Sequence, residues 1–183
     1  GTWTYTLDDN NANVQALNAG DKLHDLITAA TADGTTQVID ITIKGDNDAA
    51  VITGTAARSV REKSGVDNGT AGLATVTSDL DATDVDSAAT FVVQSNVATA
   101  YGTFSIDATG AWSYTLDDTN TLVQGLNTGG TLHELVTVAT ADGTTQVIDV
   151  TIHGANDAAV ITGTATDSVT EASGVLNGTP GDA

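Results

Sequence analysis

The chain repeats itself at an offset of 109 residues. Residues 1–74 align with residues 110–183 without a gap, and 52 of these 74 positions are identical. The unit is too long for a solenoid, whose repeats have about 20 to 45 residues, and it suits an independently folded domain. The sequence therefore predicts a tandem array of similar domains.

Two related segments predict where one unit ends and the next begins. IKGDNDAAVITG at 43–54 returns as IHGANDAAVITG at 152–163, and each joins the end of one apolar run to the start of another. If NDAAV marks the boundary, residues 1–48 are the C-terminal part of one unit, residues 49–157 are a complete unit, and residues 158–183 begin a third. Residues 1–48 would lack their opening strands, so we expect an unpaired sheet edge that is frayed or covered by a neighbouring chain.

Alternating apolar and polar residues predict strands within each unit. Residues 2–7 and 111–116 alternate aromatic or leucine side chains with Thr or Ser, and we expect Trp3 and Trp112 to anchor the cores of their units. Further strands are expected at residues 35–43, 49–56 and 89–94.

Two other local signals occur in both copies. NVQALNAGD at 13–21 and LVQGLNTGG at 122–130 predict a single helical turn that closes one end of a sandwich. The shared ADGTTQ sequence predicts a turn with Asp-Gly at its tip. About seven short strands at this spacing predict an all-β fold of tandem immunoglobulin-like or cadherin-like β-sandwich domains.

The charge limits the partners. The chain carries 24 acidic and five basic side chains, a formal net charge of -19. This charge repels phosphate backbones and anionic lipids, so we expect no nucleic-acid partner and no direct membrane insertion. It attracts cations, although solubility alone accounts for part of it. Because Cys and Met are absent, disulfides and zinc-thiolate sites are excluded, and metals remain as the stabilising cross-link for a small extracellular domain.

One acidic segment is hard to explain by turn formation alone. Asp79, Asp81, Asp84 and Asp86 fall within eight residues that contain no basic side chain. Two carboxylates about 4 Å apart near a protein surface repel by about 4 kcal/mol at an effective dielectric constant of about 20, so a clustered array needs a cation. Hard oxygen ligands favour calcium over zinc, and a coordination number of about six to eight favours calcium over magnesium.

Several motifs resemble those of cadherin-type repeats, in the same order. VTSDLDATDVDSAATFVV resembles their Asp-x-Asp segment, FSIDATGAWSYTLDD resembles a strand pair that ends in an acidic motif, and ATADGTTQVIDITIKGDNDAAV resembles the last hairpin and the linker. Over nearly all of its length the chain is most similar to bacterial VCBS repeats, cadherin-like modules found in tandem in large secreted RTX-type adhesins of Gram-negative bacteria. The resemblance implies an extracellular or cell-surface protein with Ca²⁺ bound at each junction.

The resemblance also implies the ligands at each junction. Near residue 48 they are Asp8, Asp9, Asp46, Asn47, Asp48, Asp84, Asp86 and Asp142. Near residue 157 they are Glu62, Asp117, Asp118, Asn156 and Asp157.

The chain departs from the cadherin pattern at three ligand positions. The first linker Asp is Gly45 or Gly154, the final linker Asn is Ala, and the last acidic residue of the strand-end motif is Asn or Thr. We therefore expect fewer ions per junction than in a cadherin. Asp33 and Asp142 occupy identical ADG turns, for which a plain hairpin turn is as good an explanation as a ligand role.

No catalytic signature is present, and we predict that the chain is not an enzyme. His24 and His133 occupy equivalent positions and are interpreted as exposed strand residues. The leading hypothesis is a calcium-stiffened extender repeat of an adhesin or biofilm matrix protein, whose partners are neighbouring repeats. The alternatives are a self-associating extracellular filament or sheath module, in which a strand of one copy completes the sandwich of another, and a glycan-binding module.

Overall fold

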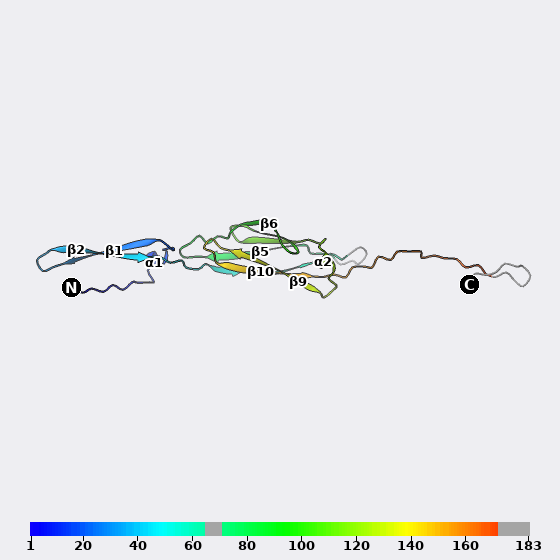
Figure 1. Ribbon diagram of the computed structural model, residues 1–183, viewed down its shortest axis with the longest axis horizontal. Helices are drawn as coiled ribbons and strands as arrows, with labels where there is room; N and C mark the ends of the chain where they lie inside the picture. The colour runs from blue at the N-terminus through cyan, green and yellow to red at the C-terminus, as the bar shows by residue number, and fades with distance from the viewer. Residues whose placement is uncertain (65–70, 172–183) are drawn as a thin grey trace, which may run out of the picture.

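The computed structural model describes residues 1–64 and 71–171 and shows an all-β chain (Figure 1). Its elements in chain order are α1 (Ala12–Gln15), β1 (Lys22–Ala30), β2 (Thr36–Lys44), β3 (Val51–Gly54), β4 (Ala57–Arg61), β5 (Thr75–Thr83), β6 (Gln94–Ala98), β7 (Gly102–Ile106), β8 (Ala111–Leu116), α2 (Thr121–Gln124), β9 (Thr131–Ala139) and β10 (Thr145–His153). Neither described helix is long and apolar enough to cross a bilayer.

The strands form three sheets. β1 and β2 form an antiparallel hairpin, β4, β10 and β9 form a three-stranded sheet, and β3, β5, β8, β7 and β6 form a five-stranded sheet in that order. β4 pairs with β10 in parallel, and the other pairs of named strands are antiparallel. In Figure 1 the β1–β2 hairpin lies near the N-terminal end of the molecule and the two larger sheets lie together at its centre.

The two larger sheets enclose one hydrophobic core, and we call β3 to β10 with α2 the two-sheet unit. The five-stranded sheet contributes Phe104, Trp112 and Tyr114, each at most 2% exposed. The centroids of the Phe104 and Trp112 rings lie 6.1 Å apart. From the three-stranded sheet, the core includes Val60, Val138, Ile148, Val150 and Ile152. This burial confirms the alternation predicted for 111–116 and the core position of Trp112.

The helical turns are where the sequence predicts them. Asn120 caps α2 by accepting the N–H of Leu122 at 3.0 Å, and Val123 of α2 is completely buried in the core. Asn11 caps α1 in the same way. The turns between β1 and β2 and between β9 and β10 carry Gly34 and Gly143 with φ of +90° and +92°, the conformation that the Asp-Gly signal requires.

The strand predicted at residues 2–7 is absent. Its copy, β8, is held by β5 on one side and β7 on the other, and nothing in this chain duplicates those strands for the N-terminal segment. Without partners the segment is extended but unpaired, and Trp3 is 59% exposed. The prediction that Trp3 anchors a core is therefore wrong for this chain.

Residues 89–94 also differ from the prediction of a strand. Phe91 donates its N–H to Ala108 of the five-stranded side at 3.1 Å, and Val92 donates its N–H to Ala139 of β9 at 2.8 Å. Because consecutive residues bond to opposite sheets, no ladder forms, and the strand begins only at Gln94.

Residues 158–163 copy β3 and its flanks but form no strand. β3 pairs with β5, and residues 75–83 of β5 have no second copy in this chain. Val160 and Ile161 are 87% and 93% exposed. An apolar alternating sequence is thus insufficient for a strand when its pairing partner is missing.

The two tryptophans provide a matched test of the core. Trp112→Ala should lower the free energy of unfolding by about 3 to 5 kcal/mol, because it removes a large buried ring. Trp3→Ala, at the equivalent position, should change it by less than about 0.5 kcal/mol, because that ring already faces water. Urea unfolding followed by circular dichroism measures both, and equal losses would contradict this description of the core.

Candidate functional site at the unit junctions

Two junctions contain the predicted metal ligands. The first junction is the linker at residues 45–50, between β2 and β3, with the loops of the two-sheet unit that face it. The second junction is the copy of that linker at residues 154–159, after β10.

At the first junction, two carboxylates of the two-sheet unit hold the linker backbone. Asp86, in the segment after β5, accepts the N–H of Asp48 at 2.9 Å. Asp142, in the turn between β9 and β10, accepts the N–H of Ala50 at 3.0 Å. The linker is therefore fixed at two points to loops that lie far apart in the sequence.

A third contact joins the preceding unit to the same loops. The side-chain amide of Asn18, which follows α1, donates to the hydroxyl of Ser87 at 2.6 Å. Sequence reasoning identified neither residue. Asn18 is matched by Asn127 at the same place in the second copy, which is the one signal that could have pointed to it.

Asp84 and Asp86 each retain a buried oxygen without a hydrogen-bond donor. Asp84 uses Oδ1 to accept the N–H groups of Asp86 and Ser87, at 3.0 and 2.8 Å. Its Oδ2 and the Oδ1 of Asp86 are inaccessible and have no donor among the described residues. A buried carboxylate oxygen without a partner costs free energy, so each of these two side chains lacks a donor or a cation for one of its oxygens.

Hydrogen bonds favour the ionised form of Asp84 and Asp142. The N–H of Ser87 holds the pKa of Asp84 below its ordinary value, and the nearby Asp142 carboxylate opposes part of that shift. The hydroxyls of Thr140 and Thr144 lower the pKa of Asp142, and the N–H of Ala50 lowers it further. Both groups are therefore negatively charged at neutral pH, close enough for their charges to interact.

At the second junction, Glu62 is the central acid. It is completely buried, its Oε2 accepts the N–H of Ala155 at 3.1 Å, and its Oε1 accepts the side-chain amide of Gln124 at 3.3 Å. Burial raises the pKa of Glu62, and the carboxylates of Asp157 and Asp118 raise it further. Asp118 also accepts the N–H of Lys63 at 3.1 Å.

The 109-residue offset relates acids of the second junction to acids of the first. The second shows the acids of the preceding unit and linker around Glu62, namely Asp118 and Asp157. The first shows the acids of the following unit, Asp84, Asp86 and Asp142, and its own copies of Asp118 and Asp157 are Asp9 and Asp48.

Other predicted ligands make local bonds. Asp8 accepts the N–H of Asn10 at 3.1 Å, and Asp117 accepts the N–H and the hydroxyl of Thr119 at 2.9 and 2.6 Å. The hydroxyl of Thr119 lowers the pKa of Asp117. Both acids therefore close local turns, and the turn of Asp117 directly follows β8.

The linker side chains are also engaged locally. Asp46 accepts the N–H of Asn47 at 3.1 Å, Asn47 donates to the carbonyl of Asp48 at 2.9 Å, and Asn156 donates to the carbonyl of Asp157 at 3.1 Å. Asp9 is exposed. Within residues 1–64 and 71–171, no three His, Asp or Glu side chains converge in an arrangement that could hold a metal ion by themselves.

Glycine at the first linker position has a steric cause. A Cβ on Gly45 would lie 2.4 Å from the carbonyl oxygen of Asn18, and one on Gly154 would lie 2.4 Å from Cβ of Leu126. The linker passes directly against the loop that follows each helical turn. An aspartate cannot occupy this position without moving the loop, which explains the departure from the cadherin pattern.

His24 and His133 are not part of either junction. Nδ1 of His24 lies 2.8 Å from Asp40, and Nδ1 of His133 lies 2.9 Å from Asp149, across β1–β2 and β9–β10 respectively. Both rings are about half exposed. Their position confirms the prediction of exposed strand histidines.

Comparison of the sequence with protein-family models finds no match, and a search of curated proteins finds no significant relative.

Asp142 and Asp33 allow the linker bond to be tested separately from the turn. Both acids cap identical ADG turns, but only Asp142 also accepts a linker N–H. Asp142→Asn should therefore lower the urea midpoint of unfolding more than Asp33→Asn at pH 7.

The pH dependence of this effect has a defined sign. Because folding lowers the pKa of Asp142, its stabilisation is present above the unfolded value of about 4 and is lost as the pH falls through the lowered folded value. The difference between Asp142→Asn and the parent chain should shrink on acidification. A difference that is constant from pH 7 to strongly acidic pH would show that the charge is not involved.

Proposed function

We propose that this chain is a spacer segment of a tandem β-sandwich array in which Ca²⁺ at each junction holds successive units in a fixed orientation. The observation that carries the proposal is that two buried carboxyl oxygens beside the linker, Asp84 Oδ2 and Asp86 Oδ1, have no hydrogen-bond donor among the described residues. A cation is the partner that such oxygens lack.

The chemistry of the junction favours a hard divalent ion. The available ligands are carboxylates, linker carbonyls and Asn oxygens, and Cys is absent. Calcium takes about six to eight oxygens at flexible geometry, which suits ligands contributed by loops of two units. When bound, it would neutralise the mutual repulsion of the acids, and the chain's own residues would position it through the backbone bonds of Asp86 and Asp142.

Figure 1 is consistent with a spacer. The hairpin of residues 22–44, the two-sheet unit and the extended segment 158–171 follow one another along the long axis. Two facing sheets of this topology support a cadherin-like or immunoglobulin-like sandwich, and the order of motifs supports membership of the VCBS repeats. We accordingly place the parent protein outside a Gram-negative cell, in an adhesin or biofilm matrix.

The glycan-binding alternative has little support. The exposure of Trp3 provides one aromatic surface. However, its copy Trp112 is buried in the two-sheet unit. The exposure of Trp3 therefore reflects the lack of flanking strands around residues 2–7 and does not indicate a sugar-binding surface.

Calcium binding should stabilise the folded chain. Extracellular modules bind calcium with Kd of about 10⁻⁴ to 10⁻³ M, and a ligand at 100 times its Kd adds about 2.7 kcal/mol to stability. The melting temperature should therefore rise with millimolar CaCl₂ and fall with EDTA, with a smaller response to MgCl₂. Thermal unfolding by differential scanning calorimetry measures this.

A double substitution assigns the binding to the junction. Asp84→Asn with Asp86→Asn keeps one acceptor oxygen at each position but removes both charges, so the calcium-dependent shift should be lost or greatly reduced. Asp79→Asn with Asp81→Asn removes the same charge from exposed positions of β5 and should leave the shift intact. An equal loss in both variants would assign the effect to net charge and not to a site.

A further inference from the structure

Two linker bonds fix the path of the chain at the first junction but leave one rotation free. Asp86 and Asp142 accept the N–H groups of Asp48 and Ala50, which lie two residues apart on one short stretch of backbone. Two points on one line do not prevent the preceding hairpin from turning about that line. The orientation of one unit against the next therefore needs a third contact that lies off the linker.

Asn18 provides such a contact, and two hydrogen bonds orient its amide. Its side-chain oxygen, Oδ1, accepts the N–H of Ala19 at 2.7 Å, and its side-chain nitrogen, Nδ2, donates to the hydroxyl of Ser87 at 2.6 Å. Asn18 and Ser87 are 69 residues apart in sequence, and both are half-buried. A polar pair that is partly shielded from water interacts more strongly than an exposed pair.

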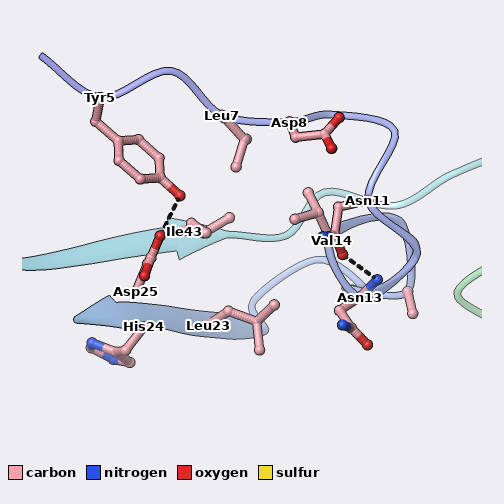
Figure 2. Close-up of a pocket in the computed structure, with 11 residues that line it drawn as sticks. Tyr5, Leu7, Asp8, Asn11, Asn13, Val14, Leu23, His24, Asp25 and Ile43 are labelled. Carbon is pink, nitrogen blue, oxygen red and sulfur yellow. Dashed lines mark hydrogen bonds between the residues drawn. The ribbon is translucent and has the colours of Figure 1, made fainter. Parts of the chain in front are cut away.

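On the preceding side, the contact comes from the base of the hairpin. Figure 2 shows α1 at this end of the hairpin, with Asn11 accepting the N–H of Asn13 at 2.9 Å. The side chains of Val14, Leu23 and Ile43 face one shared space there. The helical turn and the loop that follows it therefore lie beside the residues that lead into the linker.

The loop that carries Asn18 is packed against the start of the linker. Leu17 is only 9% exposed. The N–H of Gly45 donates to the carbonyl of Asp21 at 3.0 Å, and a Cβ on Gly45 would lie 2.4 Å from the carbonyl oxygen of Asn18. This loop therefore moves with the hairpin as one body.

On the following side, Ser87 belongs to the acidic segment at residues 84–87. Its N–H donates to Oδ1 of Asp84 at 2.8 Å, and Asp86 in the same segment accepts the N–H of Asp48 from the linker. One short segment of the two-sheet unit thus bonds both to the linker and to the loop of the preceding unit.

We propose that the Asn18–Ser87 hydrogen bond sets the rotation of the preceding unit about the first linker, and that it does so without a cation. Asn18 is then a positioning residue, which aligns the hairpin on residues 84–87. The repeat carries the same residue as Asn127 for the next junction. Because an amide and a hydroxyl are neutral, their contact does not depend on the calcium concentration.

The same alignment would prepare the proposed calcium site, and this step rests on the proposed function. Asp84 and Asp86 belong to the following unit, whereas Asp8 and Asp9 belong to the preceding one. A bond that holds the two units in register before the ion arrives lowers the ordering cost of binding. Loss of the bond should therefore weaken calcium binding roughly two- to tenfold, the range expected for one net hydrogen bond.

Interspin distances test the alignment directly, since the chain contains no native Cys. Spin labels at Gln37→Cys on β2 and Val147→Cys on β10 of the full chain are measured by double electron–electron resonance. In EDTA the parent chain should keep a maximum at the distance found in CaCl₂, within a broader distribution. Ser87→Ala should remove that maximum, because it deletes the acceptor of Asn18 and leaves the backbone bond to Asp84 in place.

Matched variants separate the contact from a general disturbance of the loop. Ser87→Thr keeps a hydroxyl and should retain the maximum, and its urea midpoint should equal that of Ser87→Ala. Asn18→Ala should lose the maximum, and combining it with Ser87→Ala should broaden the distribution no further. Asn127→Ala, the same substitution at the equivalent position, should retain the maximum, because it is Asn18 that bonds to Ser87.

Three results would overturn the proposal. These are a parent distribution in EDTA without that maximum, a Ser87→Ala distribution that matches the parent in both EDTA and CaCl₂, and an equal effect of Asn18→Ala and Asn127→Ala.

Calorimetric titration with CaCl₂ distinguishes this inference from the proposed function. A parent chain that keeps the maximum in EDTA but binds no calcium would contradict the calcium site and leave the alignment standing. Calcium binding of equal affinity in the parent and in Ser87→Ala, with equal distance distributions, would contradict the alignment and leave the calcium site standing.

Discussion

The hydrogen bond from a linker N–H to a loop carboxylate is the interaction on which the junctions depend. It occurs twice at the first junction, to Asp86 and Asp142, and once at the second, to Glu62. Each acceptor is an acidic side chain, so the residues that fix the linker are also residues that can carry negative charge where the units meet. The charges stabilise the backbone but repel one another, and the proposed cation would relieve that repulsion.

The internal repeat places one sequence in two environments. Residues 1–48 and 110–157 share most of their side chains, and both form the capped helical turn and the hairpin with an Asp-Gly tip. Only the second copy buries its apolar face, because only it is faced by β4, β5 and β7. Local sequence therefore determines turns and hairpins, while strand formation in residues 2–7 depends on partners distant in sequence.

Predictions based on short-range signals were accurate for the same reason. The strand at 35–43, the helical turns near residues 13–21 and 122–130 and the Asp-Gly turns were all predicted. The absence of a strand at residues 89–93 and the exposure of Trp3 were not predicted, because each depends on which sheets lie on either side of the segment. At the site, the sequence identified the acids near the linkers, but Gln124, Asn18 and Ser87 carry no distinctive signal. The need for glycine at position 45 follows only from the structure, in which the loop at Asn18 lies directly against it.

Whether a cation fixes one unit against the next is tested directly by measuring an interunit distance. Spin labels at Gln37→Cys on β2 and Val147→Cys on β10 report the separation of the hairpin from the two-sheet unit by double electron–electron resonance. A junction closed by calcium predicts one narrow distance distribution in CaCl₂ and a broad distribution in EDTA. Distributions of equal width in both conditions would contradict a cation-stiffened junction.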